Sequence, residues 1–357
     1  SSGGEERQRG VSLVYGALGA VLGFQFLATF LFHDGSGEAL DRAALLLRLT
    51  TAAGALVLVH NFYGQAAPAT RRHIRYATLD LSQEDHELYY NGFANRTLWP
   101  LLHFRPDLVD YRRETLAGYL RVNALFAERL APLLREDDTV WIHDYHLIPL
   151  ARMLRERGVG CRMGFFLHVP MPSSDLVAAL PGHQALFGAL AAYDLVGFQT
   201  ARDVDRFRDY MRLFAGGQLL VDARVQDADG RIFSAQAFPI SIDTAQIERQ
   251  ALQALRKPAV RLLRESLGNR QLCIGVDRLD YSKGLPDRFH AIARFLERYP
   301  QLRGQVTSLQ IAPPSRSDVP EYRALREQLE GLTGRINGRH AEPDWTPLRY
   351  VNRNFPH

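Results

Sequence analysis

The chain has 357 residues, which is enough for two domains of ordinary size, and 46% of them are hydrophobic while 23% are charged. This composition is typical of a folded protein and excludes an intrinsically disordered chain. The net charge of +4 is small and the basic residues are scattered, so nucleic acid is not an expected partner. The two cysteines, Cys161 and Cys273, lie in or beside apolar runs, which predicts buried reduced thiols in the cytoplasm.

The first 74 residues differ from the rest of the chain. Residues 11–32 carry no charge over about 22 positions, which is long enough to span a bilayer, and residues 43–59 form a shorter apolar run interrupted only by Arg48. Arginines flank the two runs, so the positive-inside rule places both ends in the cytoplasm. We therefore interpret residues 1–74 as an apolar helical hairpin, membrane-anchored on the cytoplasmic face through residues 11–59. Two buried helices of a soluble core are the alternative.

From Arg75 onward the sequence has the pattern of an α/β protein. Aromatic side chains are dense near Tyr90 and Trp99, and both side chains carry a polar group suited to the rim of a sugar pocket. Phe93 between them is expected in the core. Residues 114–130 follow as an amphipathic helix, with apolar positions that include Leu120.

Three strands, each followed by a polar tip and a helix, are predicted next. They cover residues 139–142, 163–167 and 195–198. This succession predicts a parallel sheet with crossover helices, whose polar tips lie along one edge. Asp144 and His168 each follow a strand end, so we expect them in the same crevice.

Other chemistries fit these strand tips poorly. His143, Asp144 and His146 have no further ligand nearby, so they do not predict a metal site. The sequence lacks the Gly-x-Ser-x-Gly motif, which disfavours a Ser-His-Asp hydrolase.

The segment 238–243 is interpreted as the exit from this domain. A hairpin turn at residues 227–230 precedes it, and Asp243 is a helix N-cap residue. Another helix is predicted over residues 258–267.

The most informative segment is 274–286. An apolar run over residues 272–276 predicts a short buried strand, and the polar loop after it carries Arg278 and Lys283. Gly284 and Pro286 then begin a helix, so two cations and a helix N-terminus follow a strand end. This arrangement predicts an anion site, for which phosphate is the favoured ligand, and a solvated surface loop is the alternative. The loop is not a Walker A motif, which disfavours a nucleotide hydrolase.

A strand at residues 306–311 leads to Arg316, a third candidate ligand for an anion, and residues 321–332 are predicted to be helical. Only about three strands are accounted for in this second sheet, fewer than a complete doubly wound domain has.

Several ordered motifs carry a resemblance to a known family. They are residues 143–147 (HDYHL), 164–170 (GFFLHVP), 197–200 (GFQT), 278–284 (RLDYSKG) and 334–338 (GRING). From about Arg75 to His357 the chain resembles the trehalose-6-phosphate synthases of glycosyltransferase family 20. These are retaining glycosyltransferases of the GT-B fold.

The resemblance implies an α/β, GT-B-like fold with two Rossmann-like domains, both incomplete, after the apolar hairpin. Residues 75–240 would form the N-terminal, acceptor domain without its first strand. Residues 241–357 would form part of the C-terminal, nucleotide-sugar donor domain.

The same resemblance implies transfer of glucose from UDP-glucose to glucose 6-phosphate, giving trehalose 6-phosphate and UDP. It implies no cofactor and no metal. The catalytic residues that it implies are Arg278, Lys283 and His168. The acceptor-binding residues that it implies are Tyr90, Trp99, Asp144 and Arg316.

The chain departs from the family pattern at both ends, where the glycine loop that touches both substrates and an acidic donor-gripping loop are missing. We therefore expect impaired activity of this chain alone. A catalytically silent, membrane-tethered member that binds sugar phosphate or a partner synthase is an alternative, and another GT-B enzyme such as a phosphorylase is a further one. The choice of UDP, GDP or ADP as donor nucleotide is left open, as is a homo-oligomer.

Overall fold

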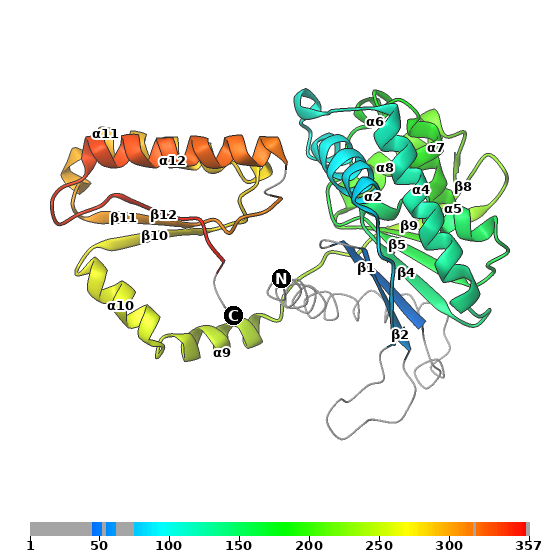
Figure 1. Cartoon of the computed structure of the whole chain (residues 1–357), viewed down its shortest axis with the longest axis horizontal. Helices are drawn as coiled ribbons and strands as arrows, with labels where there is room; N and C mark the ends of the chain where they lie inside the picture. The colour runs from blue at the N-terminus through cyan, green and yellow to red at the C-terminus, as the bar shows by residue number, and fades with distance from the viewer. Residues whose placement is uncertain (1–44, 52–54, 62–74, 317–318, 355–357) are drawn as a thin grey trace, which may run out of the picture. The chain divides into compact units, whose positions relative to one another are not determined.

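The computed structural model describes residues 45–51, 55–61, 75–316 and 319–354 (Figure 1). The chain divides into two compact units, Ser1–Ile240 and Ser241–His357. Each unit has its own sheets and helices and is described separately below.

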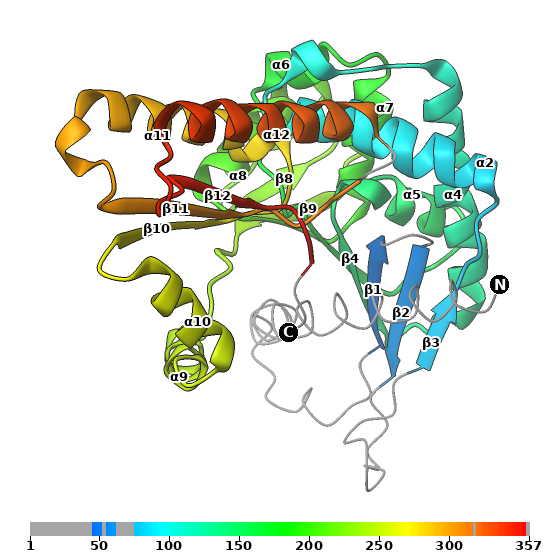
Figure 2. The same cartoon turned by 60° about the vertical axis from the view of Figure 1, so that its left-hand side comes forward.

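Three short strands begin the described part of the first unit. They are β1 (Leu45–Thr51), β2 (Ala55–Asn61) and β3 (Arg75–Thr78), and they pair in that order with antiparallel neighbours. β1 lies beside β4 (Thr139–His143) of the next sheet (Figures 1 and 2).

The predicted helical hairpin is therefore wrong for its second limb, because residues 45–51 and 55–61 are strands. A short apolar run does not distinguish helix from strand by periodicity alone, and the β-branched residues Val57 and Val59 favour an extended chain. The first limb, residues 11–32, lies outside the described residues. Among those that the structure describes, no helix is long and apolar enough to cross a membrane.

A six-stranded sheet forms the centre of the first unit. Its strand order is β4-β5-β6-β9-β8-β7, in which β4 to β6 and β9 run parallel and the last pairs are antiparallel. The strands are β4 (Thr139–His143), β5 (Arg162–Phe166), β6 (Leu195–Phe198), β7 (Gln218–Leu219), β8 (Arg224–Gln226) and β9 (Ile232–Ala237). The three predicted strand-tip-helix units are confirmed, because β4, β5 and β6 are parallel neighbours.

Helices and helical turns cover this sheet. They are α2 (Gln83–His86), η2 (Glu87–Leu98), α3 (Trp99–Leu102), η3 (Pro106–Leu108), α4 (Arg113–Leu130), η4 (Ala131–Leu133), η5 (Tyr145–Leu147), α5 (Leu150–Arg155), α6 (Ser174–Ala178), α7 (His183–Phe187), η6 (Gly188–Ala192) and α8 (Ala201–Phe214). Phe93 is fully buried, as expected. Leu120 on α4 is 37% exposed, which corrects its predicted place on the apolar face.

The second unit is a three-stranded parallel sheet with helices on its two sides. β10 (Gln271–Val276), β11 (Val306–Ile311) and β12 (Leu348–Val351) pair in that order. α11 (Leu285–Arg298) and α12 (Pro320–His340) lie on one face, and α9 (Thr244–Ala254) and α10 (Pro258–Leu267) lie toward the other (Figures 1 and 2). Two helical turns, η7 (Tyr281–Lys283) and η8 (Pro300–Leu302), complete the unit.

The core of the second unit lies between the sheet and the pair α11 and α12. Leu285 and Phe289 of α11 pack there against Leu329 of α12, and all three are fully buried. The predicted N-cap of α9 is confirmed, because the Asp243 side chain accepts a hydrogen bond from Gln246 N at 2.9 Å.

β10 differs from the sequence-based expectation of a buried strand. Ile274 and Val276 are 58% and 62% exposed, and Cys273, predicted to be buried, is exposed as well. The apolar run indicates a strand correctly, but β10 is an edge strand, because among the described residues it pairs only with β11. Cys161 in the first unit is buried, as expected.

Candidate active site

The structure brings Asp144 and His168 together in the first unit. β4 and β5 are parallel neighbours, so the residues that follow them meet at the same edge of the sheet. Asp144 N donates to Phe166 O at 2.8 Å, and His168 N donates to Asp144 Oδ1 at 3.3 Å. These hydrogen bonds confirm the expectation that the two residues meet at neighbouring strand ends. His168 is exposed and Asp144 is half-buried.

A second imidazole supports His168. The His143 Nδ1 and His168 Nε2 atoms are 2.7 Å apart, and the two rings stack with centroids 5.0 Å apart. In a hydrogen bond between two imidazoles one nitrogen must carry the proton and the other must accept it. His143 is buried, so it holds the exposed His168 ring in one orientation.

Tyr90 and Trp99 belong to one aromatic cluster with the segment after Asp144. The Tyr90 ring stacks on His146 at 5.7 Å with an interplanar angle of 13°, and Tyr145 stacks on His146 at 4.1 Å. Trp99 in turn lies 5.7 Å from Tyr145. Tyr90 is half-buried, whereas Trp99 is only 6% exposed and lies deeper than a rim position.

Close helix packing fixes η2, which carries Tyr90. A Cβ atom at Gly92 of η2 would lie 2.7 Å from Thr115 Cγ2 of α4, and a Cβ at Gly118 of α4 would overlap Leu88 of η2. Only glycine permits the two backbones to approach this closely. The position of the Tyr90 ring therefore depends on these two glycines.

In the second unit the structure brings Arg278 and Arg316 to a single carboxylate. β10 and β11 are parallel and in register from Gln271 to Val276, so the loops after them leave the same edge of the sheet. Arg278 Nη2 and Arg316 Nη1 each lie 3.9 Å from Asp280 Oδ2. The Arg278 side chain is 43% exposed and that of Arg316 is 8% exposed.

Lys283 stands at the start of α11, as the sequence predicts. It is exposed and ends η7, directly before Gly284, whose φ of 60° is the left-handed conformation that glycine adopts without strain. Pro286 lies in the first turn of α11. Lys283 and the N-terminus of α11 thus follow Arg278 along the loop after β10.

The arrangement in the second unit suits an anion. Two guanidinium groups and one carboxylate leave a net positive charge, and arginine forms paired hydrogen bonds to phosphate oxygens. The arrangement in the first unit suits a sugar, because Asp144 and the aromatic cluster offer a hydrogen-bond acceptor and flat apolar faces.

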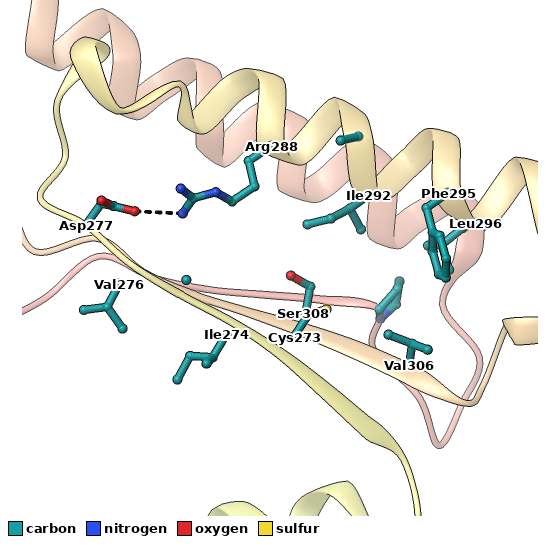
Figure 3. A pocket seen from close by; sticks show the side chains of 13 residues that line it. Cys273, Ile274, Val276, Asp277, Arg288, Ile292, Phe295, Leu296, Val306 and Ser308 are labelled. Carbon is teal, nitrogen blue, oxygen red and sulfur yellow. Dashed lines mark hydrogen bonds and ion pairs between the residues drawn. The ribbon is translucent and has the colours of Figure 1, made fainter. Parts of the chain in front are cut away.

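A hollow of about 680 Å³ opens between β10 and α11 (Figure 3). Its lining is mostly apolar, with Ile274, Ile292 and Phe295 among the labelled side chains, and Arg288 and Asp277 form an ion pair of 2.8 Å at one end. Arg278, Lys283 and Arg316 do not line it. This hollow is distinct from the candidate anion site.

Sequence reasoning missed three residues of the two clusters. His143 was weighed only as a metal ligand, and no group of metal-ligating side chains occurs among the described residues. Asp280 and Tyr322 were not singled out as site residues. Asp280 lies within the RLDYSKG motif, which offered a signal, whereas Tyr322 lies on a separate helix and had none.

Each of the two units contains a run of parallel strands, with sugar-suited residues near the strand ends of the first and phosphate-suited residues after the strand ends of the second. These features define a GT-B-like α/β protein. The family model of glycosyltransferase family 20 matches residues 63–357. The chain belongs to glycosyltransferase family 20.

A relative from Sinorhizobium fredii, named trehalose-6-phosphate synthase, is 48% identical over 281 residues, which cover 79% of this chain and 60% of the relative. The protein of the same name from Klebsiella pneumoniae is 48% identical over 286 residues, which cover 80% of this chain and 60% of that relative. This chain thus spans about 60% of the length of the curated relatives that it matches.

One solved structure that resembles this chain is that of an α,α-trehalose-phosphate synthase (UDP-forming) from Burkholderia xenovorans in complex with glucose 6-phosphate. The two structures superpose with a TM-score of 0.78. The Burkholderia xenovorans protein is 44% identical, and the match covers 87% of this chain and 66% of that one.

Proposed function

We propose that this chain transfers glucose from UDP-glucose to glucose 6-phosphate, giving trehalose 6-phosphate and UDP. The observation that carries the proposal is the family match over residues 63–357, which contains both residue clusters. The names of the relatives and the glucose 6-phosphate complex of the Burkholderia xenovorans protein support the same substrates.

The second unit supplies the anion-binding residues. Arg278 and Lys283 bind the diphosphate of the donor and stabilise the negative charge that develops on it as the glycosidic bond breaks. Arg316 binds the phosphate group of the acceptor. Both arginines lie near one carboxylate, and arginine suits oxyanions because its planar donors match their geometry.

The first unit supplies the sugar-binding residues. Tyr90, Trp99 and Asp144 line the acceptor sugar, and His168 contacts the glucose of the donor. The bond between the anomeric carbon and the diphosphate oxygen breaks as the bond to the acceptor oxygen forms. The acceptor oxygen attacks from the face that the diphosphate leaves, so the configuration is retained without an enzymic nucleophile. The acceptor proton passes to the diphosphate oxygen.

A second candidate is a form that binds sugar phosphate with little turnover. Arg278 and Arg316 lie near one carboxylate and suit a phosphate group whether or not glucose is transferred, which supports this candidate. It differs from the first candidate in turnover and not in ligand.

The experiment measures nucleoside diphosphate release by the purified chain, given UDP-glucose with and without glucose 6-phosphate. GDP-glucose and ADP-glucose are tested in parallel to determine the donor nucleotide. We expect release that requires the acceptor and that falls by about 10²-fold or more in Arg278→Ala, because a transition-state contact is lost. Arg294→Ala, an exposed arginine of α11, is the matched control and should keep full activity.

The outcomes separate the candidates. Acceptor-dependent release establishes the transferase. Binding of glucose 6-phosphate by folded protein without release supports the second candidate. A folded chain that shows no binding of glucose 6-phosphate and no release of nucleoside diphosphate would overturn both candidates.

A further inference from the structure

Asp280 occupies the centre of the arginine cluster in the second unit. Its side chain is completely buried, and both of its carboxylate oxygens have partners. Oδ1 accepts a hydrogen bond from Ser282 N at 3.0 Å, and Oδ2 accepts one from the Tyr322 hydroxyl at 3.0 Å. The same Oδ2 atom is the one that lies 3.9 Å from both Arg278 and Arg316.

Tyr322 connects Arg316 to this carboxylate. Its hydroxyl accepts a hydrogen bond from Arg316 Nη1 at 2.6 Å and donates its own proton to Asp280 Oδ2. The Arg316 guanidinium also lies 5.6 Å from the centre of the Tyr322 ring. Burial raises the pKa of Tyr322 well above its ordinary value, so the hydroxyl keeps its proton and remains a donor to Asp280.

This network fixes a buried cation in one orientation. A buried guanidinium is tolerated only when nearby groups compensate its charge, and the buried carboxylate does so through Tyr322. An arginine that is already held in place loses less conformational entropy when a ligand binds to it. Arg278, by contrast, is more exposed, and it approaches this network at the Asp280 carboxylate.

We propose that Asp280 and Tyr322 are positioning residues for the two phosphate-binding arginines. Tyr322 orients Arg316 and not Arg278, whereas Asp280 positions both arginines. This inference rests on the proposed function, which assigns Arg316 to the acceptor phosphate and Arg278 to the donor diphosphate. The two positioning residues therefore have different effects: loss of the Tyr322 hydroxyl weakens sugar-phosphate binding, and loss of the Asp280 charge weakens both ligands.

The sign of the Asp280 effect distinguishes positioning from simple charge balance. If Asp280 only neutralised positive charge, its removal would strengthen the binding of every anion. If it positions the arginines, its removal weakens anion binding although the net positive charge rises. The two explanations thus predict opposite shifts in affinity.

The first experiment measures binding to the full chain by calorimetry, with glucose 6-phosphate, glucose and UDP as probes. We expect Tyr322→Phe to bind glucose 6-phosphate about tenfold more weakly, with UDP affinity unchanged, because one hydrogen bond to a charged group is lost. Asp280→Asn should bind both glucose 6-phosphate and UDP more weakly. Tyr299→Phe, which removes a hydroxyl from a partly exposed tyrosine of the same unit, is the matched control.

A second measurement needs no ligand. Modification of Arg316 by an arginine-selective dicarbonyl reagent, followed by mass spectrometry, should be about fivefold faster in Tyr322→Phe than in the wild-type chain. It should be unchanged in Tyr299→Phe. Thermal unfolding of each variant confirms that it is folded.

The two measurements separate failure of this inference from failure of the proposed function. In one outcome the wild-type chain binds no glucose 6-phosphate, but Arg316 still reacts faster in Tyr322→Phe than in the wild type. This outcome overturns the proposed acceptor and supports the positioning role. Equal Arg316 reactivity in wild type and Tyr322→Phe overturns the positioning role, as does tighter anion binding by Asp280→Asn.

Discussion

Asp144 shows how the first unit places a carboxylate at a strand end. Its backbone angles, φ 71° and ψ 167°, fall in a region that is essentially restricted to glycine. An aspartate at this position carries backbone strain, which the surrounding structure must hold in place. The strained turn directs Asp144 Oδ1 to the backbone N–H of His168. The backbone strain at Asp144 therefore lowers stability, while the same conformation places its carboxylate at the strand end.

Two substitutions at Asp144 separate strain from side-chain loss. Both Asp144→Gly and Asp144→Ala remove the carboxylate, but only alanine keeps a Cβ atom in the unfavourable region. We expect the glycine variant to have a free energy of unfolding about 1–2 kcal/mol higher than that of the alanine variant. Urea denaturation measures the difference. Equal stability of the two variants would show that the position carries no strain.

At the scale of an element, β10 has an apolar sequence but lies at the edge of its sheet with exposed side chains. It pairs with β11 on one side only, and Ile274 and Val276 on it are more than half exposed. An edge strand with exposed apolar side chains offers unpaired backbone groups and apolar area to another chain. Neighbouring α9 and α10 add exposed apolar residues, Leu252 and Leu262 among them.

We expect the purified chain to associate in a concentration-dependent manner through β10. Val276→Lys should reduce association, because charge on an edge strand opposes pairing with another strand. Val221→Lys, at an exposed valine of the first unit, serves as the control and should associate like the wild type. Sedimentation velocity over a range of concentrations measures the effect. Identical behaviour of the two variants would contradict a role of β10.

At the scale of the whole molecule, each of the two units has buried core residues of its own among the described residues. Leu154 of α5 is fully buried in the first unit, and Leu329 of α12 is fully buried in the second. Units with separate cores unfold separately unless a large interface couples them. Thermal unfolding is therefore expected to show two transitions.

Matched truncations assign these transitions. Leu154→Ala should lower one melting temperature and Leu329→Ala the other, since each removes about 2–5 kcal/mol from its own core. Differential scanning calorimetry makes the measurement. A single transition that both variants lower equally would show that the two units unfold together.

Many elements were predicted correctly because their signals are local. The helix over residues 258–267 and the strand over 306–311 have the predicted bounds. Helix caps, apolar periodicity and turn residues within a few positions are sufficient to define such elements. The helix predicted over residues 321–332 extends from Pro320 to His340 instead, because Gly334 and Gly338 did not end it.

The α/β class and the parallel order of β4 to β6 could be predicted from the sequence, because strand, loop and helix follow one another along the chain. The positions of Arg278 and Lys283 before a helix could be predicted for the same reason. The sequence also predicted that Asp144 and His168 would meet, because parallel neighbours end at the same edge. Only the tertiary structure decided that residues 45–61 contain strands, that β10 is exposed, and that Tyr322 joins Arg316 to Asp280. These features depend on which segments become neighbours in space, and contacts between residues 42 positions apart leave no periodic signal in the sequence.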